Sequence, residues 1–305
     1  MYRLGVVSFL NARPLIEGLP ARGDVEIVYD VPARLPDSLE AGQVDAALIP
    51  IIDVLRSGGR YRVVSDACIG CDGETMTVRV FSQVPPDRIE TLWVDGDSHT
   101  SVALAAILWR ELYRRELTLR PVSTREQAID QLESVLLIGD KVVDSRRGSF
   151  AYEVDLGGAW RQHTGLPFVF AVWACPMDRH EGTETRRHEG RDRDRGAPRQ
   201  REDDEPRASA RADVRAASDS LADLLSHARD CGVGRASEIA ETHGPELGWP
   251  VELARRYLTR CLSYKLDARS IEGANLFGRL CVRAGLAPPD ADILWPEDLL
   301  LEKTV

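Results

Sequence analysis

Short apolar runs alternate with amphipathic stretches over the first 60 residues of the chain. Three of these runs, 2–7, 25–29 and 46–49, are apolar and rich in β-branched residues, which predicts β-strands. A helical pattern, LPDSLEAG, precedes the third run and ends near Gly42. Strands that alternate with helices predict a parallel sheet with crossover connections.

The same alternation returns after a break at VPPDRIE. Strand patterns at 92–94 and 135–138 lie on either side of a helical pattern over 101–113, whose apolar positions recur at helical spacing. A further helix is expected over 124–132, because a capping-box pattern opens it. Other strand-like runs lie at 63–64, 75–81 and 168–173.

Two α/β units in succession predict an α/β fold with two lobes and a cleft between them. We expect the chain to cross between the lobes at strand-like linkers, 81–85 and 168–174. Helical patterns from Leu221 to about Gly285 then need a lobe to pack on. The expected boundaries are 1–82 and 170–305 for lobe one and 83–169 for lobe two. Loops that follow the strands should face the cleft.

The stretch 178–219 differs from the rest of the chain. It is dominated by Arg, Asp and Glu and contains no Ile, Leu, Phe, Met, Trp or Tyr. Such a composition buries too little apolar surface to offset the loss of chain entropy on folding. We therefore expect a disordered insert there.

Charge and cysteine content narrow the partners and the compartment. The net charge of −10 disfavours nucleic acid and anionic membranes as partners. The opening MYRLGVVSFLNARPL lacks the basic segment and cleavage site of an export signal, so we expect a cytoplasmic protein. The six Cys show no disulfide framework and should stay reduced.

The loop after the first strand is the first candidate for chemistry. It holds Ser8, Asn11 and Arg13, and Pro14 suits the first turn of a helix. In one interpretation Ser8, Asn11 and Arg13 reach substrate in the cleft. In the other, Ser8 and Asn11 merely cap the helix.

The pattern Cys68-Ile-Gly-Cys71 invites a metal interpretation, but there is no second CxxC and no His at ligand spacing, so we expect no metal. One alternative is a glycine-rich turn that leads into a strand. The other places Cys71, Thr75 or Thr77 on the cleft wall as a neutral hydrogen-bonding group.

A strand, a short polar loop and a long helix meet at Ser98, His99, Thr100 and Ser101. A helix N-terminus offers N–H groups and partial positive charge, which can bind an anion without a basic residue. The alternative is an ordinary helix cap. His99 is either a general base or a solvated loop histidine.

A fifth loop, Gly139-Asp140-Lys141, ends a strand of the second unit. Lys141 can meet a substrate carboxylate, or Asp140 can pair with it. The sequence contains no phosphate-binding, dinucleotide-binding, nucleophile-elbow or zinc-protease motif. Ser, Thr, Asn and backbone groups suit binding, or catalysis by positioning and polarisation.

Five strings together resemble the chorismate dehydratase family of the futalosine route to menaquinone. They are VSFLNARPL, GQVDAALIP, GDSHTSVALAAILWRELY, LLIGDKVVD and TGLPFVFAVWA. The resemblance covers about 1–175 and 219–290. It implies a fold similar to type 2 periplasmic binding proteins and no metal or organic cofactor.

The resemblance also implies a reaction in which chorismate loses water to give 3-[(1-carboxyvinyl)oxy]benzoate. It implies a catalytic role for an Asn after the first strand, here Asn11, and for a small hydroxyl residue whose counterpart is Cys71 or Thr77. The proton acceptor is a protein group or the substrate's own carboxylate. The alternative function is a solute-binding protein of the same fold that captures a carboxylate without chemistry. The oligomeric state stays open.

Overall fold

The computed structural model describes five segments of the chain: 1–94, 98–123, 129–143, 149–177 and 221–301. The expected disordered insert therefore lies outside the described residues. The start of the helix expected over 124–132 lies outside them too, and the described part forms a single 3₁₀ turn, η4 (Ile129–Gln131).

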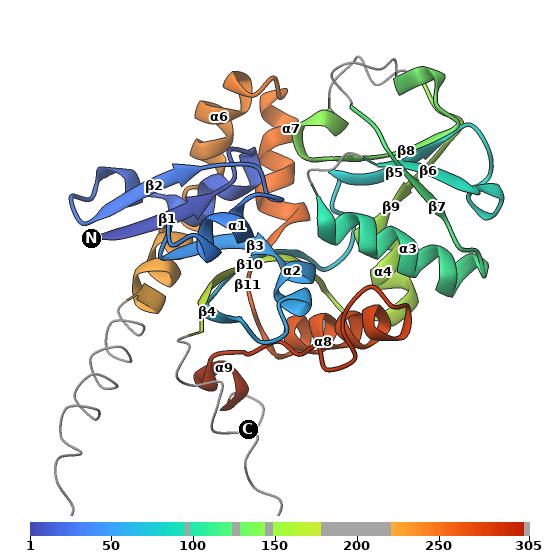
Figure 1. The fold of residues 1–305 in the computed structure, drawn as a ribbon. Coiled ribbons are helices and arrows are strands. Elements are labelled where there is room, and N and C mark those ends of the chain that lie inside the picture. Colours follow the sequence, from blue (N-terminus) through green and yellow to red (C-terminus); the bar gives the residue numbers. More distant parts are fainter. Residues whose placement is uncertain (95–97, 124–128, 144–148, 178–220, 302–305) are drawn as a thin grey trace, which may run out of the picture.

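The first sheet has six strands in the order β11-β4-β10-β3-β1-β2 (Figure 1). Three strands predicted from apolar runs are parallel to one another, as expected for crossover connections. These are β1 (Tyr2–Val6), β2 (Val25–Tyr29) and β3 (Ala46–Pro50). The other three pair antiparallel with their neighbours: β4 (Tyr61–Cys71), β10 (Phe168–Pro176) and β11 (Ser263–Lys265).

The second sheet has five strands in the order β7-β6-β8-β5-β9. They are β5 (Val78–Ser82), β6 (Thr91–Val94), β7 (Thr118–Pro121), β8 (Ser134–Ile138) and β9 (Tyr152–Asp155). The strands around β6 are parallel, whereas β5 is antiparallel to both of its neighbours. In Figure 1 this sheet lies in the green half of the molecule, beside the blue strands β1, β2 and β3 of the first sheet.

Helices cover both sheets. The longer ones are α3 (His99–Tyr113), α4 (Leu156–Thr164), α6 (Ala236–Glu246) and α8 (Ala268–Arg283). The shorter ones are α1 (Leu35–Glu40), α2 (Ile51–Arg56), α7 (Val251–Arg256) and α9 (Glu297–Leu301), and residues 221–234 are also helical. In Figure 1, α7 stands between the two halves and α8 runs beneath them.

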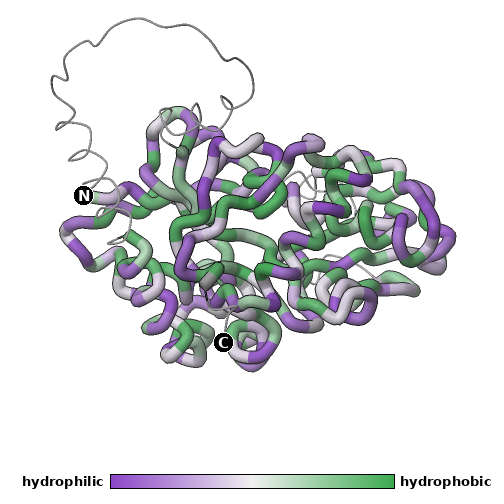
Figure 2. The backbone as a smooth tube through the Cα atoms, turned by 90° about the horizontal axis from the view of Figure 1, so that it is seen from below, coloured by the Kyte–Doolittle hydropathy of each residue, from purple (hydrophilic) through white to green (hydrophobic). Residues whose placement is uncertain are grey.

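Aromatic side chains join α4, α8 and β10 where these elements meet. Trp160, Phe168 and Phe277 are fully buried and pack edge to face, with ring centroids 5.0–6.2 Å apart. The Trp160 indole donates to the Pro167 carbonyl at 3.1 Å, so its polar atom is satisfied. The tube in Figure 2 shows apolar segments through the middle of the molecule and polar ones at the outer turns.

The first crossing between the sheets lies earlier than expected. The segment 81–85 was expected to be the linker, but β5 already pairs with β8 and β9 of the second sheet. The chain crosses between the end of β4 and the start of β5, over residues 72–77. The division of the chain into two lobes at the expected boundaries stays a prediction.

Two local expectations also differ from the structure. Cys68 and Cys71 lie inside β4 rather than in a turn, because β4 continues to Cys71 against β10. The helix after the first strand is a 3₁₀ helix, η1 (Leu10–Ile16), with Pro14 inside it. Proline lacks an N–H, which favours a short 3₁₀ segment over a long α-helix here.

Candidate active site

A cavity with about 650 Å³ of empty space, part of it open to solvent, lies where η1, the crossing 72–77, the start of α3 and η7 (Tyr257–Cys261) meet. Most of the wall is apolar, and no charged side chain is among the described residues that line it. The polar lining residues are Asn11, Thr75, Thr77, Ser98, Thr100, Ser101 and Tyr257.

Asn11 reaches the cavity from η1. The N-cap of η1 is Phe9, and no side chain caps it, so Asn11 does not have the capping role that was its alternative. Its carbonyl oxygen Oδ1 is buried and has no hydrogen-bond partner among the described residues. A buried polar atom without a partner costs free energy unless a ligand or water satisfies it. The side chain is therefore a ready hydrogen-bonding group for a ligand.

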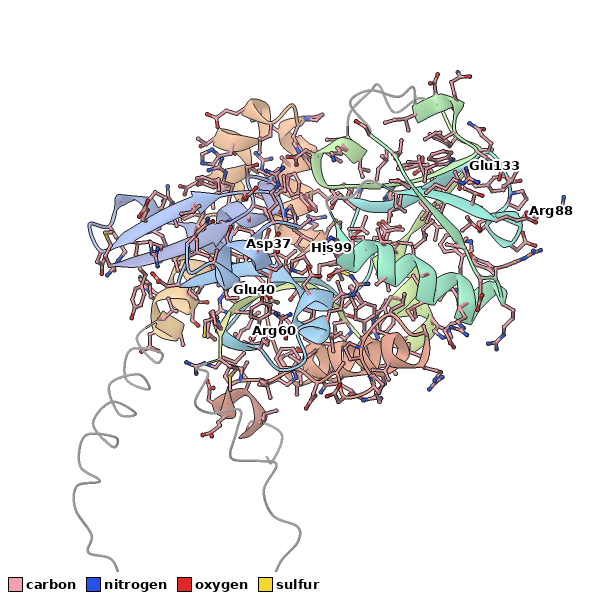
Figure 3. All side chains as sticks on the ribbon, in the orientation of Figure 1. Asp37, Glu40, Arg60, Arg88, His99 and Glu133 are labelled. Atoms are coloured by element: carbon pink, nitrogen blue, oxygen red, sulfur yellow. The ribbon has the colours of Figure 1, made fainter. Side chains whose placement is uncertain are left out.

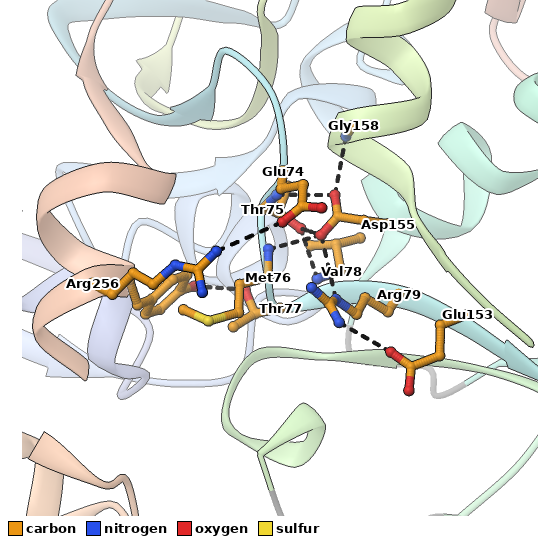
Figure 4. A network of polar contacts seen from close by, with 11 residues as sticks. Glu74, Thr75, Met76, Thr77, Val78, Arg79, Glu153, Asp155, Gly158 and Arg256 are labelled. Atoms are coloured by element: carbon orange, nitrogen blue, oxygen red, sulfur yellow. Dashed lines mark hydrogen bonds and ion pairs between the residues drawn. The ribbon is translucent and has the colours of Figure 1, made fainter. Parts of the chain in front are cut away.

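Thr77 and Thr75 stand on the crossing 72–77, which Asp155 holds in place (Figure 4). The Asp155 carboxylate accepts from the backbone N–H of Thr75 at 2.9 Å, that of Met76 at 2.8 Å and that of Gly158 at 3.0 Å. Met76 has a φ of 66°, a strained conformation for a residue with a side chain. The hydrogen bonds that Asp155 accepts stabilise this turn, which places Thr75 and Thr77 at the cavity.

Tyr257 brings a phenol to the same place from the C-terminal part of the chain. The Thr77 hydroxyl donates to the Tyr257 hydroxyl at 2.8 Å. Burial raises the pKa of Tyr257, and hydrogen bonds from Thr77 and Asn11 oppose that rise.

Ser98, Thr100 and Ser101 line the cavity at the N-terminus of α3, as the sequence indicated. Ser98 is the N-cap: its hydroxyl accepts from the Ser101 N–H at 3.4 Å and donates to the Ser101 hydroxyl at 2.8 Å. The Thr100 hydroxyl donates to the Phe170 carbonyl at 3.1 Å and accepts from the Ile52 N–H at 3.4 Å. These hydroxyls already have hydrogen-bond partners. On this side of the cavity, the backbone N–H groups of the helix terminus are therefore the donors available to an anion.

His99 is not among the described residues that line the cavity. Its Nδ1 lies 2.9 Å from a carboxylate oxygen of Asp53, on α2. The hydrogen bond with Asp53 raises the pKa of His99, against desolvation. In Figure 3 His99 stands at the junction between the blue and green parts. The geometry favours an ion pair between α2 and α3 over either role expected for this histidine.

Gly139 lines the cavity, whereas Asp140 and Lys141 are not among the described lining residues. Gly139 has a φ of 59°, which favours glycine at this turn. The Asp140 carboxylate accepts from the Trp249 indole N–H at 2.8 Å rather than serving substrate. Burial raises the pKa of Asp140, and the bond from Trp249 opposes that rise.

Three further candidates lie away from the described cavity lining. Cys71 is buried inside β4, and burial raises the pKa of its thiol to about 12. Ser8 is exposed. Arg13 places its guanidinium 5.8 Å from the centre of the Tyr29 ring. Of the two counterparts left open by the sequence, Thr77 is the one at the cavity, while the catalytic role of either stays a prediction.

Tyr257 was not predicted from the sequence. It lies 180 residues from Thr77 along the chain, and no motif surrounds it. A tyrosine in a helical pattern is indistinguishable from an ordinary core residue until the fold is known. The only hint was that the C-terminal helices needed a surface to pack on.

Comparison with known proteins bears on this site. The sequence profile of a family described as menaquinone biosynthesis matches residues 2–191. The chain belongs to this family. The matched range contains Asn11, Thr77 and the start of α3, whereas Tyr257 lies beyond it.

Curated relatives include a chorismate dehydratase from Thermus thermophilus, 26% identical over 97% of this chain and 99% of the relative. A chorismate dehydratase from Campylobacter jejuni is 27% identical over 55% of this chain and 60% of the relative. The first alignment spans nearly the whole of both chains, so the C-terminal helices also have counterparts there.

Solved structures show the fold. A protein from Archaeoglobus fulgidus superposes with a TM-score of 0.65 at 12% identity, covering 93% of this chain and 98% of that one. The alkanesulfonate-binding protein of Xanthomonas axonopodis pv. citri, bound to MOPS, gives a TM-score of 0.57 at 11% identity over 95% of each chain. The chain thus has the two-sheet fold of periplasmic binding proteins, as expected from the sequence.

The described residues contain no group of three or more His, Cys, Asp or Glu placed to hold a metal ion. Within the same residues, no helix has both the length and the apolar character needed to cross a membrane.

Proposed function

We propose that the protein is a chorismate dehydratase, a carbon–oxygen lyase that eliminates water from chorismate to give 3-[(1-carboxyvinyl)oxy]benzoate. The observation that carries the proposal is the buried Oδ1 of Asn11, which has no hydrogen-bond partner among the described residues and lies in a cavity lined by neutral hydrogen-bonding groups. Membership of the menaquinone biosynthesis family and the names of the curated relatives support it.

An anionic substrate would be held in this cavity without basic side chains. The described lining contains no Lys or Arg, and the chain carries a net charge of −10. The N-terminus of α3 supplies backbone N–H groups and partial positive charge, which attract a carboxylate. We assign Ser98, Thr100 and Ser101 to this carboxylate site, with the backbone as its main donor.

In this proposal an amide N–H of Asn11 donates to the departing oxygen, while the Thr77 hydroxyl, which donates to the Tyr257 hydroxyl, acts through that bond. Negative charge builds on that oxygen only as the C4–O bond breaks, so a donor placed there stabilises the transition state more than the bound substrate. The elimination is redox-neutral and yields an aromatic ring, so it needs neither oxidant nor reductant.

In this proposal the proton acceptor is a group of the substrate. Removal of the C3 proton requires a base, and the described lining offers no carboxylate or imidazole. Asp140 and His99, the nearest titratable candidates from the sequence, are bonded to Trp249 and Asp53 instead. The enolpyruvyl carboxylate of chorismate is an anion carried into the cavity by the ligand itself.

Incubation of the purified protein with chorismate tests the proposal. Mass spectrometry should show loss of one water and a product that co-elutes with 3-[(1-carboxyvinyl)oxy]benzoate. A heat-denatured sample measures the spontaneous background. Chorismate that binds but remains unchanged would contradict the dehydratase and favour a binding protein of the same fold.

A further inference from the structure

The C-terminal part of the chain returns to the cavity at Tyr257. This residue opens η7, a π-helical turn that follows α7. Turns of this type are rare and concentrate at functional sites, because they displace side chains from their regular helical positions. Tyr257 lines the cavity, and its side chain is only 1% exposed.

The hydrogen bonds around Tyr257 leave its own proton available. The phenol oxygen accepts from the Thr77 hydroxyl at 2.8 Å. An oxygen that accepts a hydrogen bond can still donate its own O–H to another group. The side chains of Tyr257, Thr77 and Asn11 all line the cavity, where Asn11 Oδ1 also lacks a described partner.

The Tyr257 ring is held from both sheets. It stacks on Trp249, with ring centroids 4.9 Å apart and an interplanar angle of 10°. The Trp249 indole in turn donates to Asp140 at 2.8 Å, directly after β8 of the second sheet. A group held this firmly does not need to reorganise when charge develops beside it, which is the condition for electrostatic catalysis.

We propose that Tyr257 is a further catalytic residue, whose O–H donates a hydrogen bond to the departing oxygen beside Asn11 and Thr77. This role rests on the proposed dehydration. The C3–H electron pair becomes the new ring double bond and the C3 proton goes to the base. The C4–O pair leaves with the oxygen, which takes up the proton held by the base and departs as water.

In this scheme Tyr257 keeps its proton throughout. Burial raises the pKa of the phenol, so a hydrogen bond rather than a full proton transfer is its contribution. Tyr257 and Asn11 would then share the developing charge, with Thr77 donating to the Tyr257 oxygen, so the contributions of the three residues to turnover should not be additive.

The test is the variant Tyr257→Phe, which removes only the hydroxyl and keeps the ring on Trp249. We expect kcat to fall about 10²-fold, as for loss of one transition-state donor, with a much smaller change in KM. The matched control is Tyr264→Phe. Tyr264 is buried outside the described cavity lining, and its hydroxyl has no partner among the described residues, so kcat should stay near wild type.

A second variant covers the case in which Tyr257→Phe fails to fold. Fluorotyrosine at 257 keeps the shape of the ring but makes the phenol more acidic. If the O–H donates in the transition state, this change in donor strength should change kcat.

Three outcomes separate the possibilities. Wild-type kcat in Tyr257→Phe overturns the role of Tyr257 alone. An unchanged kcat with fluorotyrosine also overturns it. A wild-type protein that leaves chorismate intact overturns the proposed function, and the role of Tyr257 with it.

Discussion

Two groups of hydroxyl and amide side chains line the same cavity but are used differently. In the Asn11 cluster, formed by Asn11, Thr77 and Tyr257, an amide oxygen lacks a described partner and the Tyr257 phenol lines the cavity. In the Ser98 cluster, formed by Ser98, Thr100 and Ser101, each hydroxyl already bonds another protein group. The sequence places Asn11 and the Ser98 cluster in similar loops after strands, whereas Tyr257 opens a helical turn.

The Ser98 cluster holds parts of the protein together, whereas the Asn11 cluster can also bind a ligand. Thr100 on α3 bonds the Phe170 carbonyl of β10 and the Ile52 N–H of α2, so its hydroxyl joins the second half of the molecule to the first. The Asn11 cluster also joins the halves, through Thr77 and Tyr257, but it keeps hydrogen-bonding capacity for a ligand. We therefore expect changes in the Asn11 cluster to lower turnover and changes in the Ser98 cluster to lower stability and affinity.

The variant Asn11→Ala should show the largest effect. It removes a donor aimed at the departing oxygen, so we expect kcat to fall about 10²–10³-fold while the melting temperature changes by a few degrees. Steady-state kinetics and thermal unfolding of one preparation measure both. The control Asn275→Ala removes an amide that accepts from Trp295 at 3.0 Å, outside the described lining, and should keep wild-type kcat. A destabilised but active Asn11→Ala would refute the catalytic assignment.

The variant Gly157→Ala tests how tightly the crossing that carries Thr77 is held. A Cβ at Gly157 would lie 2.5 Å from Thr75 Cγ2, 2.6 Å from Cys71 Sγ and 2.6 Å from the Gly73 carbonyl. Overpacking of this kind costs about 1–3 kcal/mol in the free energy of unfolding. We expect the melting temperature to fall by several degrees and kcat to fall with it, because the turn must move.

Gly158 provides the matched control for this variant. A Cβ there meets its nearest neighbour, Glu74 Cγ, at 3.5 Å, which is an ordinary contact. Because alanine is the better helix former, Gly158→Ala should equal or exceed the wild-type melting temperature. Equal melting temperatures for the two variants would show that the crossing is not tightly packed against α4.

The variant Thr100→Val tests the Ser98 cluster. Valine keeps the shape but leaves the Phe170 carbonyl and the Ile52 N–H without their partner, which costs about 1–3 kcal/mol of stability. KM should rise more than kcat falls, because the carboxylate is bound alike in the ground and transition states. Thr100→Ser retains the hydroxyl and should recover most of the loss. A defect in kcat alone, at wild-type stability, would move Thr100 into the chemistry.

The His99–Asp53 pair should have the smallest effect, and it depends on pH. The hydrogen bond with Asp53 raises the pKa of His99 in the folded state, while Arg56 lowers it and Asp37 raises it further. The pair therefore contributes stability fully below the unfolded pKa of about 6.5 and loses it as pH rises through the folded pKa.

Thermal unfolding of wild type and His99→Gln measures this effect. The difference in melting temperature should be greater at about pH 6 than at about pH 9, since the imidazole is charged only at the lower pH. The effect should be modest because the His99 side chain is 38% exposed. A difference that does not vary with pH would show that the charge of His99 is unimportant.

Local patterns predicted most of the described strands. The apolar runs at 25–29 and 92–94 form β2 and β6, and the helical pattern at 101–113 forms α3. Such runs have a period that the backbone itself imposes. The crossing was misplaced because a strand pattern such as 75–81 does not state which sheet it joins.

For the candidate site residues too, local patterns predicted a part and the packing decided the rest. The sequence alone brought Asn11, Thr77 and the start of α3 to attention, since loops after strands of an α/β sheet meet at one edge. It also favoured Cys71 equally with Thr77. Both are buried, and the surroundings of the side chain separate the two: Cys71 packs towards α4 while Thr77 lines the cavity.

The sequence by itself determined the α/β alternation, the resemblance to a family and most of the polar loops at the cavity. Only the tertiary structure decided which hydroxyls are already bonded and which groups from the C-terminal helices join the site. Tyr257 meets Thr77 across 180 residues, and Asp140 turns to Trp249 across 109. Contacts of such separation depend on how the sheets and helices pack together, which no local pattern of polar and apolar residues encodes.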